Sequence, residues 1–376
     1  MQLLATSTLI LAALTLSPDG PPPQDSGPHP AVARLGDREA AAWIADGQAC
    51  FALRLDEPRE TVRVISAVQE DLTRIDGSDV WFGAFDIERS DEVVMGVRFV
   101  FVEDGRFETG PTLPPLRGPK APPAPQRAEP LAGEIVEHEI GDAILGRLRT
   151  VWVYRPPGFE ADAIEQVVFM ADGGATERYA TVLEPLVSSG AIPPTAIVGA
   201  DNGGADPAVP GPEGDRRAHE YLAGYAEFVS SGDLEAYDRH WTFFTDFLPA
   251  WAREELGLEG EPILFGVSNG AAFCGSVAGR LPERFPAAIL CSVAWENTGD
   301  SFTATEATQR LFVTGGILEP RFLEESRAVE AAAREQGRVT RLVEAVGGHD
   351  SAVWQDQFAA GLIWLASETE RPSAAE

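Results

Sequence analysis

The sequence predicts an α/β domain with a mostly parallel sheet, preceded by a small antiparallel β sandwich. Residues 131–370 alternate near-continuous apolar runs with helix-length segments, which is typical of buried parallel strands joined by helical crossovers. Residues 31–109 instead hold short β-branched and aromatic runs punctuated by Asp-Gly turns, which favours antiparallel strands. Between them, residues 110–130 are so rich in proline that neither a helix nor a central strand can form. We therefore expect a stiff, extended linker there.

The individual elements follow from the same patterns. The expected strands of the α/β domain are "RTVWVYRP" (149–156), "QVVFMAD" (166–172), "TAIVGAD" (195–201), "PILFGV" (262–267), "AAILCSV" (287–293), "RLFVTGG" (310–316) and "VTRLVEAV" (339–346). Two of the expected helices are 240–256 and 319–337. The expected sandwich strands are "CFALRL" (50–55), "TVRVISAV" (61–68), "DVWFGAFDI" (79–87) and "GVRFVFVEDG" (96–105). We find no internal repeat.

The pattern of residues 1–30 predicts a signal-like segment followed by a disordered leader. The apolar run in "MQLLATSTLILAALTLSPDG" is typical of a secretory signal, and the residues after it are rich in Pro, Gly, Asp and Ser. The run is too short for a comfortable membrane span, and no later segment qualifies as one. We expect export to the periplasm or the medium, and a cytoplasmic protein if the segment is not a signal.

Charge and cysteine content exclude several classes of partner. A net charge of −30 argues against nucleic acid and against an anionic membrane surface, because both require clustered cations. The three cysteines, Cys50, Cys274 and Cys291, are odd in number and lack C-x-x-C spacing, which gives neither a disulfide framework nor a metal site. We expect buried thiols; the alternative is a single disulfide, if the protein lies in an oxidising compartment. Neither a metal nor an organic cofactor is expected.

The stretch "ILFGVSNGAAF" contains a candidate nucleophile, Ser268, in the order G-x-S-x-G. A buried strand precedes the motif and a helix-length run follows it, so the serine would lie in a strained strand-to-helix turn that exposes its hydroxyl. Gly266 and Gly270 would be needed because larger side chains would collide where strand and helix approach. The alternative is an ordinary serine in a turn.

A serine of this kind needs a base and an acid. Of the five histidines, only His349 lies downstream of Ser268, as the order serine, acid, histidine requires. Glu319, which follows the strand 310–316, is the leading acid, although a glutamate at a helix start can simply interact with the helix dipole. The rival acids are Glu296, Asp300 and Asp350.

Two backbone segments are candidates for an oxyanion hole. Asn269 would begin the helix after the serine, so its N–H would face a developing negative charge. The Gly173–Gly174 turn after the strand 166–172 would supply the second donor, unless it is a plain tight turn.

A series of segments follows in a fixed order along the chain: "LRTVWVYRPPGF", "VVFMADGG", "GAIPPTAIVGAD", "RAHEY", "GVSNGAAF", "GGILEP" and "GGHDSAVWQDQFAAGL", with "LTRIDGSDVWFGAFDI" in the first region. In these segments most of the chain resembles the enterochelin (enterobactin) esterase family of α/β hydrolases. The resemblance implies an α/β-hydrolase fold behind a β sandwich, with Ser268 as nucleophile, His349 as base and Glu319 as acid. The chain departs from the family in the turn that contains Ser268, where it has S-N-G-A and the family has S-x-G-G.

The resemblance also implies a small-molecule ester as substrate, such as a siderophore lactone, or an acyl or phenolic ester on sugar or peptide. Arg217 and Glu220, in "RAHEY", are candidates for contacting the substrate, but we favour a structural ion pair between them. An acyltransferase with the same three residues and a binding protein on a disabled hydrolase scaffold are the alternatives. The complete set Ser268, Glu319 and His349 argues against the binding protein.

Overall fold

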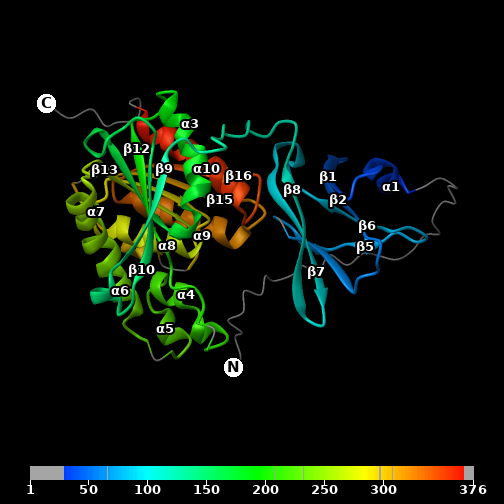
Figure 1. Ribbon diagram of the computed structural model, residues 1–376, viewed down its shortest axis with the longest axis horizontal. Helices are drawn as coiled ribbons and strands as arrows, with labels where there is room; N and C mark the ends of the chain where they lie inside the picture. Colours follow the sequence, from blue (N-terminus) through cyan, green and yellow to red (C-terminus); the bar gives the residue numbers. More distant parts are fainter. Residues whose placement is uncertain are drawn as a thin grey trace.

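The computed structural model describes residues 29–367, apart from 66, 207, 232, 296, 297 and 307 (Figure 1). The expected signal segment and nearly all of the expected leader lie outside the described residues, as does the candidate acid Glu296. Among the helices of the described residues, none combines the length and apolar character that a membrane crossing requires.

Within the described residues the large sheet has eight strands in the order β16-β15-β14-β13-β11-β12-β10-β9. Their bounds are β9 Glu134–Ile140, β10 Arg149–Arg155, β11 Gln166–Ala171, β12 Thr195–Ala200, β13 Glu261–Val267, β14 Ala287–Cys291, β15 Arg310–Gly316 and β16 Val339–Ala345. The pairs from β16 through β12 are parallel, while β10 runs antiparallel to both β12 and β9. The mostly parallel sheet is therefore confirmed.

Helices cover both faces of this sheet (Figure 1). On one face α3 (Thr176–Ser188) and α10 (Ser351–Ala366) bury aromatic and aliphatic side chains against the strands. On the other face lie α7 (Leu248–Leu256), α8 (Asn269–Arg280) and α9 (Pro320–Glu335). The shorter helices are α2 (Asp142–Leu145), α4 (Arg216–Tyr221), α5 (Tyr225–Phe228) and α6 (Ala236–Thr242), and a π-helical turn, Phe243–Phe247, joins α6 to α7. The buried strands are continuous apolar runs in the sequence because helices cover both faces of the sheet.

The N-terminal region is antiparallel, as predicted, and packs two four-stranded sheets around one core. One sheet contains, in this order, β1 (Ala40–Ala45), β2 (Gln48–Arg54), β6 (Val80–Asp86) and β5 (Thr73–Arg74). The other contains β4 (Gln69–Asp71), β3 (Thr61–Ile65), β7 (Val94–Glu103) and β8 (Arg106–Arg117). The short helix α1 (Pro30–Leu35) precedes them. Phe51 from one sheet and Phe99 from the other are fully buried in the shared core.

The expected linker begins too early, because β8 continues to Arg117 instead of ending before residue 110. β8 is an edge strand, and an edge strand tolerates proline because only one of its sides must donate to a neighbour. The register irregularities opposite Met95–Val97 and Arg98–Val100 of β7 accommodate the proline-rich sequence. Proline is excluded from central strands, but β8 lies at the edge of its sheet and retains its prolines.

The aromatic contacts at the centre of the large sheet predict a large loss of stability on truncation. The ring of Phe265 lies 4.6 Å from that of Tyr179 and 4.6 Å from that of Phe358, and so joins β13 to α3 and α10. Phe265→Ala should lower the free energy of unfolding by about 3–5 kcal/mol in urea titrations. Phe107→Ala, at a side chain that is 66% exposed, is the matched control and should be nearly neutral. Equal effects of the two substitutions would contradict this assignment of the core.

Candidate active site

Ser268 lies between β13 and α8 in a backbone conformation that few non-glycine residues adopt, with φ 57° and ψ −126°. The two flanking glycines are required for the reason expected. A Cβ atom on Gly266 would lie 2.2 Å from the carbonyl oxygen of Gly270, and one on Gly270 would lie 3.0 Å from the Ala171 Cβ. The strand, the turn and the helix therefore approach as closely as backbone contact allows.

Three side chains from distant parts of the chain form a continuous row of hydrogen bonds. His349 Nε2 lies 3.0 Å from Ser268 Oγ, and His349 Nδ1 lies 2.7 Å from Glu319 Oε2. The three residues follow β13, β15 and β16, whose carboxyl ends meet at the same edge of the sheet. A hydroxyl, an imidazole and a carboxylate thus stand in the order that transfers a proton away from the hydroxyl.

Glu319 is only 5% exposed, and its carboxylate is held by several donors. Its Oε1 accepts hydrogen bonds from the Gly316 N–H, at 2.7 Å, and from the Ser292 hydroxyl, at 2.5 Å. The indole N–H of Trp354 in turn donates to Ser292 Oγ at 2.8 Å. Oε1 is therefore fixed by the protein, which leaves Oε2 directed at His349.

Ser292 and Trp354 were not singled out by the sequence analysis. Trp354 also packs edge-on against the ring of His349, with centroids 4.8 Å apart and planes at 88°. The ring of Phe322 also packs against that of His349, with centroids 4.1 Å apart. A signal was present for both residues: Ser292 follows a parallel strand, and Trp354 lies about one helical turn beyond the histidine.

The rival acids that the structure describes lie elsewhere. Asp300 is exposed in a short 3-10 turn. Asp350 points away from its neighbour His349 and caps α10, because its Oδ1 accepts from the N–H groups of Ala352, at 2.8 Å, and Val353, at 3.3 Å. Glu319 is thus the one of the described candidates that contacts the imidazole.

The candidate oxyanion donors flank the same edge of the sheet. Asn269 is the first residue of α8, and the first N–H groups of a helix lack an acceptor within it. Gly173 and Gly174 open a 3-10 turn directly after β11, the neighbour of β13. A Cβ atom on Gly173 would lie 2.2 Å from the Gly199 carbonyl oxygen, so this turn also depends on glycine.

The expected ion pair between Arg217 and Glu220 does not form, because each side chain has a different partner. Arg217 makes a bidentate pair with Asp172, with Nε and Nη2 each 2.7 Å from a carboxylate oxygen, and Nη2 also lies 3.3 Å from the Val267 carbonyl oxygen. Asp172 precedes the Gly173 turn and has φ 62°. Arg217 therefore links the turn after β11 to the residue before Ser268.

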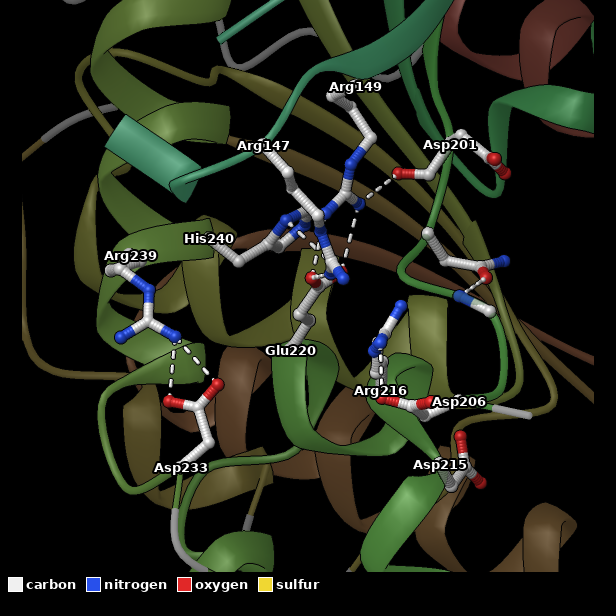
Figure 2. Close-up of polar contacts among 12 residues, drawn as sticks. Arg147, Arg149, Asp201, Asp206, Asp215, Arg216, Glu220, Asp233, Arg239 and His240 are labelled. Carbon is white, nitrogen blue, oxygen red and sulfur yellow. Dashed lines mark hydrogen bonds and ion pairs between the residues drawn. The ribbon is translucent and has the colours of Figure 1, made fainter. Parts of the chain in front are cut away.

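Glu220 is buried within a second group of charges (Figure 2). Arg149 donates to both its oxygens, at 2.7 and 2.9 Å, and to the Asp201 carbonyl oxygen; Arg147 pairs with Oε1 as well. The guanidinium groups hold the pKa of Glu220 below its usual range despite the opposing effect of burial. The adjacent His240 is fully buried, which lowers its pKa to about 4 and keeps it neutral. Glu220 faces these partners, with 4% of its surface exposed.

Two surfaces are formed by residues that contact the segment around Ser268. A cavity of about 420 Å³ is lined by Arg217 and by the loop from Asn202 to Asp215. On another side the Ala294 N–H donates to the Ser268 carbonyl oxygen, at 3.3 Å, and the next residue is Trp295. Its ring packs against Tyr225 and Phe228 of α5, at 5.7 and 5.8 Å, and Phe228 is 59% exposed. An aromatic wall made of Tyr225, Phe228 and Trp295 therefore lies beside the Ser268 turn.

A mostly parallel sheet with a polar site at its carboxyl edge, behind an antiparallel β domain, is consistent with an α/β-hydrolase-like protein. Residues 143–365, more than half of the chain, match the Esterase family model, described as "Putative esterase". The chain therefore belongs to this family, and it is an ester hydrolase.

Solved structures show the same fold at low sequence identity. Ferric enterobactin esterase from Salmonella typhimurium matches with a TM-score of 0.64 and 17% identity, over 89% of this chain and 98% of that chain. The enterobactin esterase from Shigella flexneri, in the presence of enterobactin, gives 0.65 and 18%, over 89% and 97%. The BES protein from Bacillus cereus gives 0.50 and 16%, over 62% and 96%. No curated protein is similar enough in sequence to match the chain.

The buried charges around Glu220 predict a stability effect that depends on burial. Arg149→Met removes the bidentate partner of Glu220 and leaves its carboxylate undercompensated, which should destabilise the fold by about 3 kcal/mol. Arg155→Met, on the same strand β10, breaks the exposed pair with Glu134 and should cost below about 1 kcal/mol. Denaturant unfolding of both variants measures the difference, and a loss at Arg149 no larger than at Arg155 would contradict it.

Proposed function

We propose that this esterase acts through a catalytic triad of Ser268, His349 and Glu319 on an α/β-hydrolase fold. The observation that carries the proposal is the row of hydrogen bonds from the Ser268 hydroxyl through the His349 ring to the Glu319 carboxylate. The strained conformation of Ser268 adds support, because a nucleophile projected above a sheet requires such a turn.

In the first half of the reaction, Ser268 Oγ attacks the ester carbonyl carbon while His349 Nε2 takes the hydroxyl proton. Glu319 accepts the Nδ1–H of the ring, fixes the tautomer and stabilises the imidazolium. The carbonyl oxygen becomes an oxyanion, which the N–H groups of Asn269 and of the Gly173–Gly174 turn stabilise. Collapse of this intermediate breaks the carbon–oxygen bond of the ester, and His349 gives its proton to the leaving alcohol.

In the second half, water replaces the alcohol. His349 takes a proton from the water while the water oxygen attacks the acyl carbon on Ser268. The same N–H donors stabilise the second oxyanion. When the second intermediate collapses, the proton returns to Ser268 Oγ and the carboxylic acid is released. Hydrolysis by this route needs no metal or organic cofactor, because all proton transfers are made by His349.

The first candidate substrate is a siderophore lactone. The support is the family together with the fold likeness to enterobactin esterases, which extends over 89% of this chain. Lactone opening uses the steps above, except that the leaving alcohol remains part of the same molecule as the acyl group, so hydrolysis of the acyl-enzyme releases a single open-chain hydroxy acid.

The charges near the site favour a second candidate, a neutral phenolic or carbohydrate-linked acyl ester. Each arginine closest to the cavity is paired with a carboxylate: Arg216 with Asp206 and Arg217 with Asp172. The chain as a whole carries −30, so its field repels multiply charged anions such as ferric catecholates. A neutral ester meets no such penalty, and the Tyr225–Phe228–Trp295 wall offers an apolar surface.

Ser268→Ala tests the triad. The variant should lower kcat on a chromogenic short-chain ester by at least about a thousandfold, because no other group replaces the nucleophile. Ser276→Ala, at a buried serine further along α8, is the matched control and should keep wild-type kcat. Unfolding curves confirm that both variants fold. Equal rates for wild type and Ser268→Ala would refute the mechanism.

The substrate is identified by a panel with mass-spectrometric readout. The panel contains ferric and iron-free siderophores and aryl-ester saccharides, with acceptor alcohols added in a parallel series to detect acyl transfer. From the charges, we expect iron-free or neutral esters to be hydrolysed faster than ferric anionic complexes. A preference for the ferric complexes would favour the siderophore lactone in its metal-bound form, and transfer in place of hydrolysis would identify an acyltransferase.

The contacts of Glu319 predict a role for Ser292. Ser292→Ala removes one donor from the buried carboxylate, and loss of a hydrogen bond to a charged group costs about 1.5–3 kcal/mol, which corresponds to a tenfold to hundredfold loss in kcat. Ser326→Ala is the control, because this buried serine bonds the Thr314 carbonyl and the Val293 N–H but not Glu319. A pH profile of kcat/KM should change shape for Ser292→Ala alone. Matching profiles for the two variants would exclude the role.

A further inference from the structure

The loops that carry Glu319 and His349 are both packed against the N-terminal domain. At the start of β7, the Val94 N–H donates to the Val346 carbonyl oxygen, at 2.8 Å. The Val346 side chain is 7% exposed and belongs to the core of the sandwich. Ile317 and Leu318, the two residues before Glu319, pack against the same core. This core therefore includes residues of the acid loop and of the histidine loop.

The contacts continue on either side of the histidine itself. Gly348 lies so close to the N-terminal domain that a Cβ atom on it would be 2.7 Å from the Cα of Ala67. On the other side, the Asp350 carboxyl group lies against Gly96 of β7, where an added Cβ atom would be 3.4 Å from Asp350 Oδ1. Both chain neighbours of His349 thus touch a domain that does not contain the nucleophile.

An ion pair extends this interface to α10. Arg117, at the end of β8, makes a bidentate pair with Asp356, with N–O distances of 2.7 and 2.8 Å and side-chain exposures of 22% and 10%. Ser268, by contrast, is held inside the α/β domain: its N–H donates to the Cys291 carbonyl, and its carbonyl accepts from Ala271 and Ala272. In Figure 1 the sandwich lies beside the β15 and β16 edge of the large sheet.

We propose that the N-terminal domain positions the acid and the base of the triad, and that Arg117 is a positioning residue. The inference rests on the proposed function, because it concerns the same three residues. A displacement of about 1 Å at a reacting group can cost up to about a hundredfold in rate. Because these contacts act on the loops that carry Glu319 and His349, loss of this support should reduce kcat and leave KM nearly unchanged.

A charge swap in the full-length chain tests the inference. Arg117→Asp places two carboxylates at a half-buried contact, and we expect kcat to fall about tenfold or more with KM within about twofold. Asp356→Arg alone places two guanidinium groups there, and it provides the same test if the first variant does not fold. The double variant Arg117→Asp/Asp356→Arg restores an opposite-charge pair and should recover most of the lost kcat.

The matched control is Arg59→Asp. It breaks the pairs of Arg59 with Glu103 and Glu108 at the other end of β7, within the same domain. Thermal unfolding of all variants separates a loss of folded protein from a loss of rate. We expect Arg59→Asp to keep wild-type kcat, which would show that the effect depends on the interface and not on the charge of the domain.

The outcomes distinguish this inference from the proposed function. If Ser268→Ala is inactive but the folded Arg117 and Asp356 single variants keep wild-type kcat, the positioning role is refuted and the triad stands. An effect on KM alone would also refute it and would indicate that the domain binds substrate. If Ser268→Ala retains full activity, the triad itself fails, whatever the interface variants do.

Discussion

The two hydrogen bonds of the His349 ring are the constraint on which the rest of the site depends. One imidazole must reach Ser268 with Nε2 and Glu319 with Nδ1, at 3.0 and 2.7 Å. This requires the ends of β13, β15 and β16 to be fixed relative to one another, and parallel strands achieve it because their carboxyl ends share one edge of the sheet. The intervening strand β14 is not a spacer, since Ser292 follows it and donates to Glu319.

Around this row, pairing of charges gives rigidity in a strongly acidic protein. Arg217 joins Asp172 to the elbow, and Arg149 holds Glu220 beside the loop that begins at Asp201. Arginine suits both positions, because its planar fork satisfies a carboxylate with two hydrogen bonds and still reaches a backbone carbonyl. These arginines therefore hold turns in place, and Arg217 ties the geometry of the glycine turn after β11 to that of the turn at Ser268.

Much of the fold could be predicted from the sequence because buried parallel strands leave a one-dimensional signal. Each expected strand of the large sheet corresponds to an observed one. The order of Ser268, Glu319 and His349 along the chain predicted that they would meet, and the structure places them in hydrogen-bond contact. The partners of Arg217 and Glu220 could not be predicted, since they lie 45 and 71 residues away and a single sequence does not reveal which carboxylate or guanidinium is nearest. The end of β8 was missed because proline signals a break unless the strand lies at an edge.

The position of β16 in the sheet explains why a second domain matters to the site. β16 is the outermost strand, so it has a neighbour on one side only, and the loop after it is less restrained by the sheet than the loop after a central strand. That loop carries His349, the residue with the strictest geometric demands. The Val94–Val346 hydrogen bond and the contacts of Gly348 and Asp350 with the sandwich restrain the loop from the side where the sheet ends. The loop of His349, which follows an edge strand, thus obtains from the N-terminal domain the restraint that a further strand would otherwise give.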